Sequence, residues 1–238
     1  MTISYTTALI SPAITVTICI AFLSLVSFIA FLIFKYGKQR TEKFKQAADD
    51  LGLSFFPKGK RSFRDQLKHL QLFSDNSFER IKNLSHGEIN NVEIAVFDYK
   101  HGTRRAIRDS DQTDRKESII FFRSSDLNLP NFALSEAFQI FQQFVGVIGY
   151  EDINFESHPT FSKKYLLNCN NESALRQLFN DELISFLEGK NGINVEGCED
   201  QLIFYRSEEP IKPEEVRQFI QEGFEIFKQF RRASMATF

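Results

Sequence analysis

A long uncharged segment at the start of the chain constrains the fold more than any other feature. The protein has 238 residues and 60 charged side chains, yet residues 1–34 contain no Asp, Glu, Lys or Arg. Residues 13–34 (AITVTICIAFLSLVSFIAFLIF) are apolar enough to form about 33 Å of helix, which matches a hydrocarbon core of about 30 Å. We therefore predict one transmembrane helix over residues 13–34.

Two other interpretations of this segment are weaker. A buried helix of a soluble protein rarely runs for 22 residues without an amphipathic face. A cleaved signal peptide has a basic N-terminal region, a shorter apolar core and a small-x-small cleavage site. The sequence shows none of these three features.

Basic residues are concentrated directly after the apolar segment. The positive-inside rule therefore predicts that residues 1–12 lie outside the cytoplasm and that the rest of the chain is cytoplasmic. The same residues could contact anionic lipid headgroups from the cytoplasmic side. They lie in a predicted helix over residues 35–52, and they are Lys35, Lys38, Arg40, Lys43 and Lys45.

The remainder, residues 53–238, is predicted to be one cytoplasmic α+β domain with an antiparallel sheet and amphipathic helices, with sub-halves at 53–130 and 131–238. No Gly/Ser-rich or Pro-rich linker divides it. The patterns predict strands over 53–56, 78–84, 92–99, 118–123, 164–168, 193–197 and 201–206, with a turn over 86–91 and a polar loop over 102–117. They predict helices over 63–72, 131–149, 172–179, 181–188 and from Pro213 onward.

The uncharged part of the predicted helix over 131–149, residues 137–150, is too short to cross a membrane. Contact of this segment with the membrane surface stays open from sequence alone. The thiols of Cys169 and Cys198 are expected to be reduced, because a cytoplasmic domain rarely carries a disulfide. A bond between these two residues is expected only if the domain lies outside the cytoplasm.

One segment has the side chains needed for acid–base chemistry. Glu156, His158 and Tyr165 lie within YEDINFESHPTFSKKYLL, beside predicted core elements, and could act together if they converge. The Ser-His-Pro sequence is equally typical of a turn whose side chains satisfy backbone groups. These three residues are weak catalytic candidates.

The polar loop is the first candidate for contact with a partner protein, because long loops often carry function. Its basic residues are Arg104, Arg105 and Arg108, together with Arg115 and Lys116. A solvated hairpin tip explains the same composition. The acidic residues of the loop do not have the spacing of an EF-hand calcium site.

Other site classes find no support in the sequence. The four histidines are scattered without zinc-ligand spacing, so no metal site is predicted. There is no phosphate-binding glycine loop and no G-x-S-x-G motif, and no cofactor is implied. Outside residues 35–45 the chain has no basic stretch typical of nucleic-acid binding.

Three sequence strings resemble a family of uncharacterised bacterial single-span membrane proteins. They are FDY at residues 97–99, SHPTFSKKYLL at 157–167 and ESALRQLF at 172–179. The resemblance implies one N-terminal span, a basic juxtamembrane segment, a compact domain of about 200 residues and a bacterial inner membrane. It implies no activity and no site residue.

Three hypotheses follow. The first is a non-enzymatic, membrane-anchored cytoplasmic module that binds a protein partner or a small ligand. The second is a membrane-tethered hydrolase or transferase of unrecognised type. The third is a sensor of anionic lipid surfaces that uses the basic residues 35–45 and the uncharged helical segment over residues 137–150. The sequence does not identify the partner, the ligand or the oligomeric state.

Overall fold

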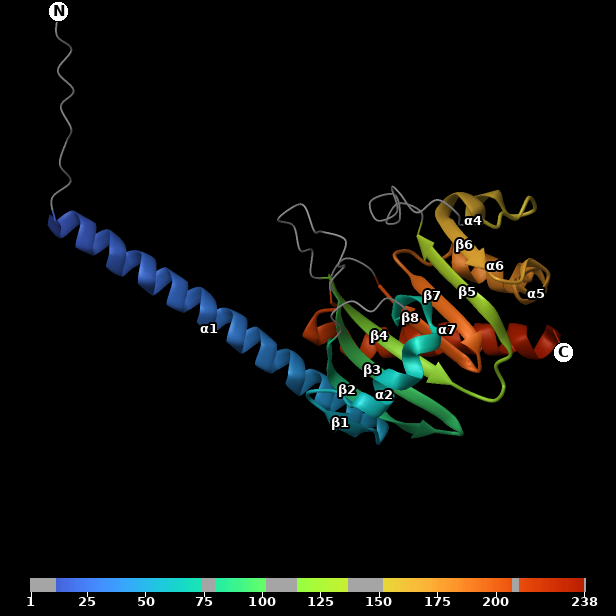
Figure 1. Cartoon of the computed structure of the whole chain (residues 1–238), viewed down its shortest axis with the longest axis horizontal. Coiled ribbons are helices and arrows are strands. Elements are labelled where there is room, and N and C mark those ends of the chain that lie inside the picture. The colour runs from blue at the N-terminus through green and yellow to red at the C-terminus, as the bar shows by residue number, and fades with distance from the viewer. Residues whose placement is uncertain (1–11, 74–79, 102–114, 137–151, 207–209, 238) are drawn as a thin grey trace, which may run out of the picture. The chain divides into compact units, whose positions relative to one another are not determined.

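The computed structural model describes residues 12–73, 80–101, 115–136, 152–206 and 210–237 (Figure 1). The chain divides into two compact units, Met1–Glu42 and Lys43–Phe238. The first unit holds most of helix α1, and the second holds the sheet and all other described helices.

Helix α1 runs from Pro12 to Leu51 without a break. Residues 14–51 are long enough and apolar enough to cross a membrane, and none of the most apolar window is buried. The hydroxyl of Ser24 donates a hydrogen bond to the carbonyl of Ile20 at 2.8 Å, which satisfies a polar group inside the apolar segment. Gly52, with φ +70°, ends the helix as the sequence predicts.

The second unit has an α+β fold, as predicted. Its eight strands form one antiparallel sheet in the order β1-β2-β3-β4-β8-β7-β5-β6. The strands are β1 (Ser54–Phe56), β2 (Arg80–Ile89), β3 (Val92–His101), β4 (Arg115–Arg123), β5 (Leu129–Glu136), β6 (Tyr165–Cys169), β7 (Asn194–Glu199) and β8 (Gln201–Tyr205).

Helices cover both faces of the sheet. In Figure 1, α7 lies behind the sheet and α2 in front of it. The α-helices that follow α1 are α2 (Arg61–Gln66), α4 (Pro159–Lys164), α5 (Glu172–Leu178), α6 (Asp181–Glu188) and α7 (Val216–Thr237). Short 3-10 turns are η1 (Leu67–His69), η2 (Gln71–Phe73) and η3 (Pro213–Glu215).

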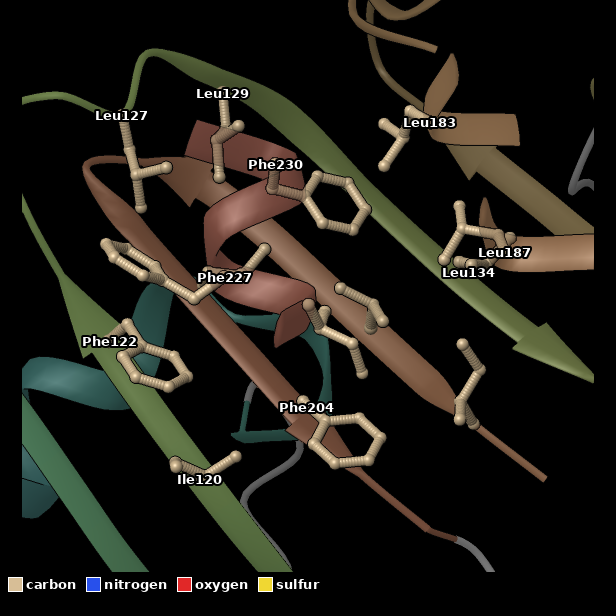
Figure 2. Packing of buried hydrophobic residues seen from close by; sticks show 14 of the residues in the cluster. Ile120, Phe122, Leu127, Leu129, Leu134, Leu183, Leu187, Phe204, Phe227 and Phe230 are labelled. Atoms are coloured by element: carbon tan, nitrogen blue, oxygen red, sulfur yellow. The ribbon is translucent and has the colours of Figure 1, made fainter. Parts of the chain in front are cut away.

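The larger core lies between the sheet and helices α5, α6 and α7. Phe227 stacks on Phe122 of β4 with ring centroids 4.6 Å apart, and Phe230 stacks on Phe132 of β5 at 5.5 Å. Figure 2 shows these helix residues directed at β4, β8 and β5. The last turns of α1 contribute to this core through Phe44, Ala47 and Ala48.

A smaller core covers the opposite face. Phe63 of α2 packs edge-on against Phe97 and Phe121 at 5.3 and 5.5 Å. Phe73 of η2 lies 4.6 Å from the ring of Tyr99. The segment from α2 to η2 therefore buries the front of β3 and β4, and the sheet is covered on both sides here.

Two sequence predictions are wrong in this unit. Residues 131–136 form most of strand β5 rather than the start of a helix, and Ser135 pairs with Leu166 of β6. The strand is favoured because Phe132 and Leu134 point into one core while β5 pairs with a strand on each side. Residues 137–149 of that predicted helix lie outside the described residues.

The second error concerns the turn predicted over residues 86–91. Strand β2 continues through His86 to Ile89, and the hairpin turn consists of Asn90 and Asn91 alone, with φ of 51° and 62°. Asparagine tolerates this left-handed backbone better than most residues. The predicted polar loop also ends earlier than expected, because β4 starts at Arg115.

Candidate functional site

Tyr165 is buried at the start of β6. Its single hydroxyl hydrogen is shared between two backbone carbonyls, that of Lys190 at 2.8 Å and that of Leu187 at 3.2 Å. Burial raises the pKa of this phenol well above its ordinary value, so the hydroxyl stays protonated. Tyr165 thus satisfies carbonyls at the end of α6, a structural role that keeps its proton in place.

His158 lies at the N-terminal end of α4 and faces helix α6. Its Nε2 is 3.1 Å from the carboxylate of Asp181, and its Nδ1 is 3.9 Å from Glu188. Glu188 also accepts a hydrogen bond from the backbone N–H of Phe161 at 3.0 Å. These contacts connect α4 to both ends of α6.

Glu156 is the third weak catalytic candidate, and it is exposed in the turn before α4. Among the described contacts, none joins Glu156 to His158 or Tyr165. The segment therefore brings His158 and Tyr165 to the same helix, α6, where each has separate partners.

The predicted basic residues have mixed environments. Four of them are exposed on α1, namely Lys35, Lys38, Lys43 and Lys45. Arg40 is buried, with 7% of its surface exposed. The partner-contact candidates Arg104, Arg105 and Arg108 lie outside the described residues.

A buried acid that the sequence did not predict lies in the middle of β7. Glu196 is 4% exposed, and its carboxylate accepts hydrogen bonds from the backbone N–H of Leu72 at 3.0 Å and from the hydroxyl of Tyr205 at 3.2 Å. Burial, with a smaller contribution from the nearby Glu117, raises the pKa of Glu196 to about 7. This carboxyl fastens η2 to the sheet.

The signal for this buried acid is indirect. Glu196 alternates along β7 with Val195 and Gly197, so its side chain points away from the larger core. A polar residue at such a position is usually exposed to water. Here the apolar η1–η2 segment covers it, and the nearby Gln71 donates a hydrogen bond to Asn168 at 3.0 Å.

A cavity of about 480 Å³ opens at one end of strands β5, β6 and β7. It lies where β5 begins, where β6 and β7 end, and beside helix α5. Its lining is mostly uncharged and contains four asparagines and one glutamine. The lining residues are Asn128, Leu129, Pro130, Asn131, Asn170, Asn171, Ala174, Gln177, Leu178, Cys198 and Glu199.

Two cysteines lie at this end of the sheet, and both are free. Burial raises the pKa of both the Cys169 and Cys198 thiols, which disfavours the nucleophilic thiolate form. Phe132 of β5 pairs with Cys169 on one side and with Gly197 on the other. The two cysteines are therefore about 10 Å apart across β5, too far for a disulfide.

The described residues show no arrangement that would bind a metal ion. Within the ranges that the structure covers, no group of three or more His, Cys, Asp or Glu side chains could hold a metal ion. The cavity lining itself offers one carboxylate and one thiol, which is a poor donor set for a metal. The lining can form hydrogen bonds mainly through uncharged groups, next to small apolar surfaces.

Comparison with known proteins gives a similarity of fold. No family model and no curated protein sequence matches this chain. A similar solved structure is the crystal structure of the mycobacterial trehalose monomycolate transport factor A, TtfA. The two share 11% sequence identity at a TM-score of 0.55, over 83% of this chain and 93% of the other. This likeness shows the fold alone.

Proposed function

We propose that this chain is a single-span membrane protein whose folded domain is a non-enzymatic accessory module that binds a protein partner at the membrane. The observation that carries the proposal is helix α1, whose apolar part is unburied and is joined to the domain within one helix. A helix with so many apolar side chains exposed needs lipid around it.

The topology is part of the same proposal. The N-terminus lies outside and the domain lies in the cytoplasm of a bacterium, on the inner face of the plasma membrane. The exposed Lys35, Lys38, Lys43 and Lys45 follow the apolar segment and support this orientation through the positive-inside rule.

Partner binding is favoured over catalysis because the predicted catalytic groups have structural partners. The Tyr165 hydroxyl is held by two backbone carbonyls, and His158 lies beside two carboxylates of α6. The structural neighbour is named a transport factor, and this name supports an accessory role.

The membrane anchor and its orientation are tested on the full chain expressed in bacteria. We expect the protein to stay in the membrane fraction after alkaline extraction and to become extractable when residues 13–34 are deleted. In a variant without Cys169 and Cys198, a Thr160→Cys thiol should react with a membrane-impermeant maleimide only after lysis. Release of the full chain, or labelling of intact cells, would contradict the proposal.

Partner binding is tested by photo-crosslinking in intact membranes. A photoreactive phenylalanine is placed, one site at a time, at the exposed positions Ser54, Thr160, Ser173 and Lys228 on four different elements. We expect an adduct of constant mass from a subset of these positions, lost when residues 13–34 are deleted. Equal labelling from all four positions, or adducts independent of the anchor, would argue against a specific partner at the membrane.

A second candidate function is recognition of anionic lipid. The four exposed lysines of α1 favour it, because each basic residue near an anionic surface contributes about 1 kcal/mol to binding. The test uses residues 35–238, the chain without its membrane segment, and vesicles with and without anionic lipid. Binding that ignores lipid charge would remove this candidate.

A further inference from the structure

The cavity at the end of β5, β6 and β7 is set apart by the chemistry of its lining. Four of the lining residues are asparagines, and they come from two separate parts of the chain, residues 128–131 and residues 170–171. No lysine, arginine or histidine is among the lining residues. An anionic ligand would therefore lose its hydration in the cavity without gaining an opposite charge.

We propose that this cavity binds a neutral, polyhydroxylated molecule, such as a disaccharide or the sugar part of a larger molecule. A carboxamide offers two donors and an acceptor without charge, and a hydroxyl group offers one donor and two acceptors. Amides therefore match hydroxyl groups whichever way the hydroxyls turn. This inference goes beyond partner binding and concerns a different surface feature.

Two of the amides are available for a ligand. Among the residues that the structure describes, the side chains of Asn128 and Asn131 have no hydrogen-bond partner, although their backbone groups do. The N–H of Asn128 donates to Ser234 Oγ at 2.8 Å, and the carbonyl of Asn131 accepts from Asn170 at 3.2 Å. The backbone at both positions is thus fixed, and both residues belong to the lining of the cavity.

The rest of the lining suits the carbon skeleton of a sugar. Pro130 and Ala174 supply partly exposed apolar surface against which C–H groups can pack, whereas Leu129 and Leu178 are almost wholly buried in the larger core. A volume of about 480 Å³ lies within the range of about 300–1,000 Å³ that is typical of small-molecule sites. Apolar contact beside neutral donors and acceptors is the combination that a ring with hydroxyl groups requires.

The cavity is largely preformed. The side chain of Asn171 accepts a hydrogen bond from Ala174 at 3.2 Å and so fixes the start of α5. Glu199, at the rim, has φ +55° in the tight turn between β7 and β8, a conformation that costs a non-glycine residue about 1 kcal/mol or more. A preformed site avoids the ordering cost that weakens binding by flexible loops.

The test measures saturation-transfer NMR from the full chain in lipid nanodiscs, which avoid sugar-based detergents. The probes are maltose and trehalose as neutral disaccharides, glucose 6-phosphate as an anionic sugar, and an N-acetylated tri-alanine amide as a peptide. We expect saturation transfer to at least one disaccharide and much weaker transfer to the phosphate and to the peptide.

Three variants locate the binding. Asn131→Ala removes an amide without a partner and should weaken disaccharide binding about tenfold, while Ala174→Phe fills the cavity and should abolish it. Asn191→Ala, an exposed site outside the cavity, should have no effect. Near-ultraviolet circular dichroism checks that each variant is folded. Because Asn131→Ala breaks no internal hydrogen bond, this variant keeps the proposal testable if Ala174→Phe fails to fold.

The proposal is overturned if neither disaccharide receives saturation, or if Asn131→Ala and Asn191→Ala reduce the transfer equally. It is also overturned if the peptide or the sugar phosphate is the better ligand, since either result would assign the amides to a different chemistry. None of these outcomes depends on whether a protein partner is found by crosslinking.

Discussion

The buried carboxyl of Glu196 makes the stability of the domain depend on pH in a defined direction. Its pKa is raised from 4.5 to about 7 in the folded chain, chiefly by burial. The carboxyl is protonated in both the folded and unfolded chains at low pH. As pH rises from 4.5 towards 7 the unfolded chain ionises first, which favours unfolding, and above 7 the loss of stability is complete.

The size of this loss follows from the two pKa values. Each pKa unit corresponds to about 1.4 kcal/mol, so the free energy of unfolding should fall by about 3 kcal/mol between pH 4 and pH 8 through this group. Glu196→Gln removes the charge and keeps both contacts, because a glutamine can accept from the Leu72 N–H and donate to the Tyr205 hydroxyl.

The assay is urea unfolding of the full chain, followed by near-ultraviolet circular dichroism at several pH values. The measured quantity is the difference in unfolding free energy between Glu196→Gln and the unaltered chain, because other titrating groups cancel in it. We expect this difference to increase by about 3 kcal/mol, in favour of the variant, between pH 4 and pH 8. Glu88→Gln, at an exposed position of β2, is the matched control.

A difference that stays constant with pH would refute the reasoning. It would mean that the carboxyl is hydrated, or is held as a carboxylate by its hydrogen bonds. A difference that rises equally for Glu88→Gln would place the effect in the net charge of the chain and not in the buried site.

Three other changes test the fold and the thiols. A Cβ at position 223 of α7 would lie 2.7 Å from Ile120 Cγ2, so Gly223→Ala should lower the unfolding free energy by about 1 kcal/mol or more despite its better helix propensity, as measured in urea. Asn91→Gly should be neutral or slightly stabilising in the same assay, whereas Asn91→Val should cost about 1–2 kcal/mol because φ is +62°. In a variant without Cys19 of the membrane segment, the thiols of Cys169 and Cys198 should react with a disulfide reagent only slowly below pH 9.0, their ordinary pKa. Rapid reaction at pH 7 would contradict their burial.

Local sequence patterns predicted the elements that depend on local interactions. Helices α5 and α6 begin after Asn171 and Asn180, whose side chains accept hydrogen bonds from the backbone three residues on, so the start of each helix is encoded nearby. The strands over 92–99 and 118–123 were predicted from two apolar runs, and the structure pairs them as β3 and β4, with Val96 opposite Ile120. The apolar segment of α1 could be predicted from its composition and length alone.

The errors occur where distant residues decide the structure. The backbone of β5 pairs with β6, about 30 residues later, and with β7, about 60 residues later, and neither partner is visible in the apolar spacing of residues 131–149. The extended turn prediction at 86–91 failed for a different reason. Two adjacent asparagines formed the hairpin turn without a glycine to mark it.

The mistaken helix also explains why the amide-lined cavity was missed, whereas Glu196 was missed because the η1–η2 segment covers it. With β5 in place, Ala133 lies opposite Glu196 of β7, and the start of the strand brings Asn131 beside Asn170. The amide-lined cavity is therefore a consequence of β5, the strand that joins β6 to β7. A helix at these residues would separate them and would leave only the residues around His158 as a candidate site. The test of the cavity is thus also a test of β5, because Asn131→Ala can affect a ligand bound beside Asn170 only if this strand pairing exists.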